Sequence, residues 1–280
     1  ELVTRRGDAV MVNRNDAERI IPKTALEMFY RKLRCLTGTP RDKFEAIENL
    51  LHGRHGATDA SFLSQLFSRS VAHASLYRNV AETFCPDRAE AQEVIDDDQF
   101  ARNLVLRMGN GQPVMVEDDS ISMVDFEIYP FRTTYSCTES GEPATWSGSG
   151  GMDMLLAVES KDGVVIPAVG EIKASTETVG PTFALIQALM YASQLITKNQ
   201  FERLQEHYNV PFEGIDTRHP KMDLIILLQS EPQEDRDDLD FALELAGNLA
   251  NNLNDKIRQI KFFRCQIADN EVRFQIINNE

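Results

Sequence analysis

The sequence predicts an α/β protein, in which a mixed β-sheet is flanked by helices and preceded by a helical N-terminal region. Through the first part of the chain, apolar residues recur at three- and four-residue steps, the spacing of amphipathic helices. From residue 122 the pattern becomes strand, strand, helix, strand, helix and hairpin, an order that fits a mixed sheet covered by helices. We therefore expect a helical region over 1–86 and an α/β domain over 87–280.

The N-terminal helices are predicted from their periodicity and from the residues at their ends. We expect helices over 23–36, 40–51, 59–84 and 85–108. Pro40 suits the first turn of the second helix, and Asp59 is a suitable N-cap for the third. The GNGQP stretch ends the fourth helix.

The second part of the chain alternates strands with helices. Expected strands cover 122–131, 152–160, 164–175 and 221–229, and expected helices cover 181–197, 200–208 and 238–257. The segment KMDLIILLQ (221–229) is almost wholly apolar, as in a strand covered on both faces. A terminal hairpin within 260–277 is expected to turn at Asp269–Asn270.

Composition limits the classes of function. The net charge of −15 lies entirely in residues 111–280, because residues 1–110 carry equal numbers of acidic and basic side chains. An acidic surface repels phosphate, which argues against a general nucleic-acid coating protein. It still permits an enzyme whose carboxylates hold divalent cations, since the bound metal inverts the local charge.

Cysteine spacing and hydropathy further limit the kinds of metal site, the compartment and the partners that we expect. The four cysteines are far apart and form no C-x-x-C pair, which argues against a clustered zinc or iron–sulfur site and fits a cytoplasmic protein. No apolar run approaches the ~20 residues that span a bilayer, so we expect no membrane partner.

An acid and a base interrupt an otherwise apolar strand. In VVIPAVGEIKAS (164–175), Glu171 and Lys173 share one face, because strand side chains alternate. The preceding strand offers Asp153, whose position depends on the turn. A two-residue loop would put Asp153 on the opposite face, whereas a three-residue loop with Gly163 in the left-handed position places it opposite Glu171. We favour the three-residue loop, although Pro167 could introduce a bulge that changes the count.

In that register two carboxylates and one ammonium meet. Two like charges a few ångströms apart are unfavourable unless a cation joins them. Mg²⁺ or Mn²⁺ suits Asp153 and Glu171, and the backbone carbonyl of Ile172 could supply a further oxygen. Lys173 could then orient or deprotonate the attacking water, or offset charge developing on a phosphate oxygen.

The helix over 181–197 carries an uncharged polar stripe. Gln187, Tyr191 and Gln194 fall at i, i+4 and i+7 among apolar and small residues. Hydrogen-bonding groups on a buried helix need partners, and a hydrated active site provides them.

Together these segments resemble the PD-(D/E)xK nuclease superfamily, in particular its RecB-like branch. The motifs G-x-x-D, D/E-x-K and Q-x-x-x-Y occur in order as GGMD (150–153), EIK (171–173) and QALMY (187–191). The resemblance implies a restriction-endonuclease-like fold and metal-dependent hydrolysis of phosphodiester bonds, with DNA as the expected substrate. It makes Asp153 and Glu171 the metal ligands, Lys173 the catalytic lysine, and Gln187 and Tyr191 positioning residues.

Many members of this superfamily also use a His or Glu from an upstream helix as a metal ligand. The candidates here are Glu93, Glu127 and His73. We prefer Glu93, because an acid on the helix before the sheet could reach the active edge.

The alternative is a catalytically silent module with the same fold. Such a module would bind nucleic acid, or a protein partner through the N-terminal helices. The complete Asp/Glu/Lys set favours the nuclease, and the net charge of −15 favours the silent module. Arg31, Lys32 and Arg34 could touch a phosphate backbone or form a solvated helix face, and Trp146 could stack on a base or anchor its loop.

Overall fold

A mixed β-sheet of seven strands organises the protein, and the predicted α/β class is confirmed. The computed structural model describes residues 2–5, 8–11, 24–52, 58–76, 99–109, 112–128, 151–174, 177, 179–229, 236–268 and 271–278. The strands are β1 (Leu2–Arg5), β2 (Asp8–Met11), β3 (Val114–Val116), β4 (Asp119–Ile128), β5 (Met152–Glu159), β6 (Val165–Lys173), β7 (Met222–Gln229), β8 (Ile257–Ala268) and β9 (Glu271–Ile277). The helices are α2 (Ala25–Arg34), α3 (Pro40–His52), α4 (Asp59–Leu76), α6 (Gln99–Gly109), α7 (Pro181–Leu195), α8 (Lys198–His207), α9 (Asn209–Phe212) and α10 (Arg236–Asn252).

The sheet has the strand order β3-β4-β5-β6-β7-β8-β9. Strands β3 to β6 pair antiparallel, β6, β7 and β8 pair parallel, and β9 returns antiparallel to β8. The edge strands β3 and β9 contact each other, so the sheet is strongly curved and partly barrel-like.

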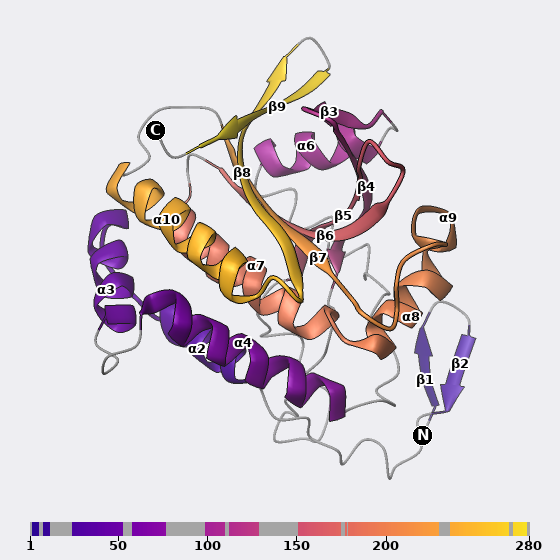
Figure 1. The fold of residues 1–280 in the computed structure, drawn as a ribbon, viewed down its shortest axis with the longest axis horizontal. Coiled ribbons are helices and arrows are strands. Elements are labelled where there is room, and N and C mark those ends of the chain that lie inside the picture. Colours follow the sequence, from indigo (N-terminus) through magenta and orange to yellow (C-terminus); the bar gives the residue numbers. More distant parts are fainter. Residues whose placement is uncertain are drawn as a thin grey trace.

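Helices cover both faces of this sheet in layers (Figure 1). On one face α6 packs against β4 and β9 over a core that includes Leu104, Phe263 and Cys265. On the other face α7 and α10 form the first layer, and α2 and α4 pack outside them. Residues of α2, α3 and α4 belong to the same hydrophobic core as α7, α10 and the sheet. None of the helices that the structure describes is long and apolar enough to cross a membrane.

The N-terminal region differs from prediction in two details. The chain begins with a small hairpin, β1–β2, where we expected only helices. The cap of α4 is Thr58 and not Asp59, because the Thr58 hydroxyl accepts a 3.2 Å hydrogen bond from the Ser61 N–H. Asp59 is the first helical residue and pairs with His52 at 2.7 Å. The predicted boundary at residue 86 falls outside the described residues.

The predicted three-residue turn between β5 and β6 is confirmed. Glu159 pairs with Val165 and Met154 with Gly170, without a register shift at Pro167. Gly163 has a φ of 75°, and its N–H donates to the Ser160 carbonyl. Continuing this register by one residue places Asp153 opposite Glu171.

Substituting Gly163 with Ala should lower the free energy of unfolding by about 1 kcal/mol. The left-handed conformation disfavours a Cβ atom by this order even though no heavy atom lies within 4 Å of its position. Gly247→Ala in α10 is the control, because a helical glycine without positive φ should gain about 0.5–1 kcal/mol from the same change. Urea denaturation measures both, and equal effects would contradict the proposed role of the turn conformation.

The start of α7 is fixed by α10. The Thr182 N–H donates to the Asp238 carboxylate at 3.0 Å, and a Cβ at Gly180 would lie 1.9 Å from that carboxylate. Glycine at position 180 therefore lets Asp238 approach and cap the N-terminus of α7. This contact sets the place of Phe183, one turn into the helix, relative to β6.

Candidate active site

The structure brings Asp153, Glu171 and Lys173 together at the ends of β5 and β6. The Lys173 ammonium lies 3.0 Å from Glu171 Oε1. The Ile172 N–H donates to Asp153 Oδ2 at 2.7 Å, and the strand register places Asp153 opposite Glu171. The convergence expected from the turn at Gly163 is therefore present.

The three groups are largely removed from water. Glu171 has no exposed surface, and Lys173 is 9 % exposed, while Asp153 keeps some contact with solvent. One oxygen of Glu171, Oε2, is buried without a hydrogen-bond partner in the described part of the chain. A buried carboxylate oxygen without a hydrogen-bond donor is unfavourable, so Glu171 is the site residue that most needs a further partner.

Burial raises the pKa values of both acids. Burial raises the pKa of Asp153 to about 6, against the lowering effects of the Lys173 charge and the Ile172 N–H bond. Burial and the Asp153 charge raise the pKa of Glu171 well above its ordinary value. A proton or a bound cation relieves the repulsion between two buried acids that lie opposite each other on neighbouring strands.

Lys173 is held as an ammonium ion. Burial lowers its pKa, but the nearby carboxylates, Glu171 first, outweigh this effect and raise the pKa above its ordinary value. The lysine of this arrangement is thus suited to stabilise negative charge and not to accept a proton.

Three further side chains border the site and were missed by the sequence analysis. Glu177 lies 3.1 Å from the Lys173 ammonium. The Phe183 ring of α7 lies 5.9 Å from the same ammonium, and the Tyr30 ring of α2 lies 5.2 Å from Phe183. Burial and the Glu171 charge raise the pKa of the Tyr30 hydroxyl. Glu177 could have been found from the sequence, because it lies four residues after Lys173. The pairing of Tyr30 with Phe183 could not, because these residues are far apart in the sequence.

The predicted polar stripe lies on a helix that packs against β6, one of the two strands that carry the site. Helix α7 packs against β6 and β7, and Gln187, Tyr191 and Gln194 are all buried. Gln187 follows Phe183 by four residues, so it lies one turn further along the same face of α7. The stripe therefore continues from the aromatic ring that contacts Lys173.

No upstream metal ligand is found among the described side chains. Glu93 lies outside the described residues, as does the side chain of Glu127. The pairs Phe126–Met154 and Ile128–Met152 place the backbone of Glu127 opposite Asp153. His73 lies on α4, and the described residues contain no group of three or more His, Cys, Asp or Glu side chains that could hold a metal ion.

The donor set nevertheless fits a hard divalent cation. Mg²⁺ is commonly held by one or two carboxylates, with water and substrate phosphate completing its shell. Asp153 and Glu171 supply two acids on neighbouring strands, and Glu171 Oε2 has no hydrogen-bond partner in the part of the chain that the structure describes. The Ile172 side chain is buried on the other face of β6, which leaves its proposed carbonyl contact a prediction.

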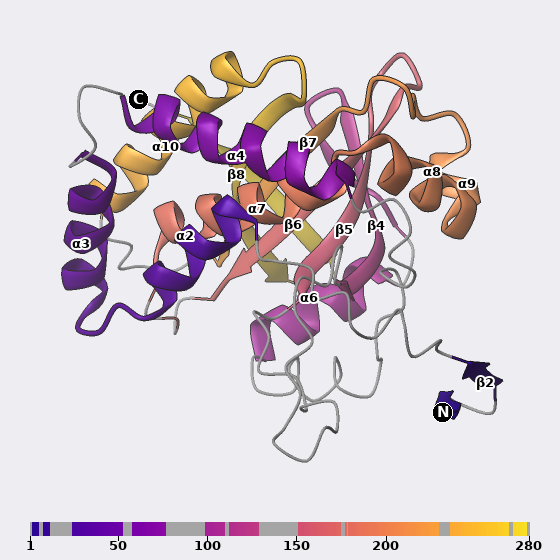
Figure 2. The ribbon, with the colours of Figure 1, turned by 90° about the horizontal axis from the view of Figure 1, so that it is seen from below.

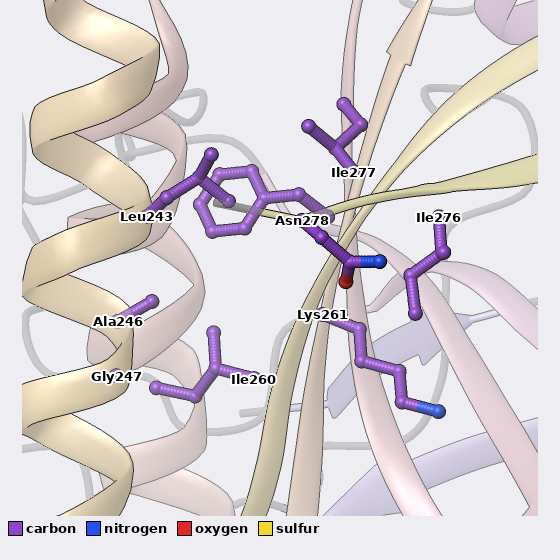
Figure 3. Close-up of a pocket in the computed structure, with 9 residues that line it drawn as sticks. Leu243, Ala246, Gly247, Ile260, Lys261, Ile276, Ile277 and Asn278 are labelled. Carbon is purple, nitrogen blue, oxygen red and sulfur yellow. The ribbon is translucent and has the colours of Figure 1, made fainter. Parts of the chain in front are cut away.

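A separate pocket has fewer charged groups for binding a ligand than the site around Glu171. A hollow of about 160 Å³ lies between α10 and strands β8 and β9, lined mainly by apolar side chains such as Leu243, Ile260 and Ile276 (Figure 3). Its one charged lining residue, Lys261, also pairs with Asp119. The described site residues Asp153, Glu171 and Lys173 do not line it.

Comparisons of the chain with protein-family models, with curated proteins and with solved structures gave no match. The case for a function therefore depends on the residues and geometry described above.

Proposed function

We propose that the protein is a divalent-cation-dependent nuclease of the PD-(D/E)xK type, with a restriction-endonuclease-like fold and DNA as its substrate. The supporting observation is that two acids on neighbouring strands converge with a buried lysine. The ordered motifs GGMD, EIK and QALMY support the same proposal. A structural ion pair alone does not account for a fully buried acid with one oxygen that has no hydrogen-bond partner among the described residues.

In the proposed reaction, water attacks the phosphorus atom and loses a proton to solvent, the bond to the leaving sugar oxygen breaks, and that oxygen takes up a proton from solvent to become a hydroxyl. Asp153 and Glu171 would hold Mg²⁺ or Mn²⁺, which supplies charge neutralisation at the phosphate when bound. Lys173 would stabilise the negative charge that develops on the phosphate oxygens. Gln187 and Tyr191 would orient groups at the site from α7.

The test is a cleavage assay on plasmid, linear duplex DNA, single-stranded DNA and RNA, with Mg²⁺, with Mn²⁺ and with a chelator. We expect cation-dependent cleavage by the wild type and a loss of about 100- to 1,000-fold in Lys173→Ala, the usual effect of removing one preorganised electrostatic group. Lys198→Ala is the matched control, because Lys198 is 63 % exposed on α8 and should be dispensable.

Calorimetry with Mg²⁺ and Mn²⁺ distinguishes the alternatives. If the wild type cuts no substrate and binds no cation, the nuclease proposal is wrong. Nucleic-acid or protein binding without cation binding would favour the silent module, for which the net charge of −15 is the supporting observation.

A further inference from the structure

Helix α2 forms one wall of the candidate active site. Its Tyr30 ring contacts Phe183, and Phe183 in turn lies beside the Lys173 ammonium. Figure 2 shows α2 alongside α7, in agreement with the contacts between these two helices. A substrate strand at the carboxylates therefore has α2 as a neighbour.

The last turn of α2 carries three cations that point in different directions. Arg31, Lys32 and Arg34 are the basic residues of this turn. Successive helix residues are rotated by about 100°, so Arg34 lies one turn beyond Tyr30 on the same face, whereas Lys32 lies on the opposite face. Arg31 is turned toward Glu27, with which it forms an ion pair at 3.7 Å.

The position of Arg34 on the Tyr30 face of α2 agrees with its effect on the pKa of Tyr30. The charges of Arg34 and Lys173 lower the pKa of the Tyr30 hydroxyl, while Glu171 and Asp153 raise it. The charge of Arg34 thus affects the Tyr30 hydroxyl, as do the charges of Asp153, Glu171 and Lys173. Its own side chain is exposed, as is that of Lys32.

A polyanionic substrate needs local positive charge to approach this site. Among the described residues, the carboxyl groups of Asp153, Glu171 and Glu177 surround the Lys173 ammonium, in a chain of net charge −15. A guanidinium group is well suited to phosphate because its planar donors can bind two oxygens at once.

We propose that Arg34, on the Tyr30 face of α2, binds the phosphate backbone of the nucleic-acid substrate next to the carboxylate site. This inference rests on the proposed nuclease function and assigns the N-terminal helical region a part in it. Lys32, two residues before Arg34 and on the opposite face of the helix, has no such role.

The test is the binding of fluorescently labelled duplex and single-stranded DNA by the full chain, measured by anisotropy over a range of salt concentrations. We expect Arg34→Ala to weaken binding several-fold and to reduce the slope of log K against log salt by about one, the effect of losing one phosphate contact. Arg34→Lys should restore most of the slope. Lys32→Ala removes the same charge and should change neither quantity.

Cleavage kinetics provide the second readout. Arg34→Ala should raise KM and leave kcat nearly unchanged, since Arg34 holds the backbone and not the reacting phosphate. Equal salt slopes for Arg34→Ala and Lys32→Ala would overturn the inference, even if the wild type cleaves DNA. A wild type that fails to bind either DNA would also overturn it. A wild type that binds DNA through Arg34 but neither cleaves it nor binds a cation would instead overturn the nuclease proposal alone.

Discussion

Replacing Glu171 with Gln should remove cation-dependent cleavage, with a loss of about 100-fold or more, while the metal-free protein stays at least as stable as the wild type. Glu171 is fully buried, its Oε2 has no hydrogen-bond partner among the described residues, and the Asp153 charge raises its pKa. Glutamine has the same shape without the charge, so it relieves the repulsion and can still accept a hydrogen bond from Lys173. This result would mean that Glu171 serves the function of the protein and lowers the stability of the fold.

Thermal unfolding with and without Mg²⁺ tests this expectation together with the cleavage assay. A ligand that binds only the folded state stabilises it by about 2.7 kcal/mol at 100 times its Kd, so Mg²⁺ should raise the wild-type Tm. That increase should be absent in Glu171→Gln. Glu159→Gln is the matched control, because Glu159 is exposed at the other end of β5 and should affect neither measurement.

The opposite result would assign Glu171 a structural role. If Glu171→Gln unfolds more easily and cleaves at the wild-type rate, the Glu171–Lys173 pair stabilises the fold and holds no cation. The nuclease proposal would then lose one of its two metal ligands.

The strand and helix content around the site could be predicted because the signals are local. The spacing of Gly163 after β5 determines the turn, the turn determines the register, and the register places Asp153 opposite Glu171. The stripe of Gln187 and Tyr191 follows from helical periodicity in the same way. Each of these steps needs only a few neighbouring residues.

The contacts between distant segments could not be predicted in this way. Nothing in the α2 sequence indicates that Tyr30 packs against Phe183, because its apolar face would suit any hydrophobic partner. The curvature of the sheet was also missed, since it depends on how β3 and β9 meet after all the strands are in place. The error at the α4 cap was smaller: Thr58 and Asp59 are both good capping residues, and they are adjacent.

The curvature brings together a second set of charges that the sequence analysis did not single out. Asp223 of β7 is fully buried and is bound by the Arg258 guanidinium through both carboxylate oxygens. Gln259 adds a hydrogen bond of 2.8 Å, and Asp119 of β4 lies 3.9 Å from Arg258 across the curved sheet. Burial raises the pKa of Asp223 in spite of the Arg258 and Gln259 hydrogen bonds.

Arg258→Ala should therefore lower the free energy of unfolding by about 3–5 kcal/mol, because it leaves the buried Asp223 carboxylate without its counter-charge. In a chain of this size that loss corresponds to a decrease in Tm on the order of 10 °C. Thermal and urea unfolding measure it. Arg273→Ala in β9 is the matched control, since Arg273 and its partner Glu271 are 64 % and 68 % exposed, and the change should stay within about 0.5 kcal/mol.

Asp223→Asn in the Arg258→Ala background should recover part of the lost stability, because the unpaired charge is then removed. A double-mutant cycle gives the coupling free energy between the two residues. Additive effects, or an Arg258→Ala loss no larger than that of Arg273→Ala, would mean that Asp223 is neutralised without Arg258. In that case the pair does not stabilise the curvature that brings β4 near β8, and the apolar core around α6 must hold the sheet closed by itself.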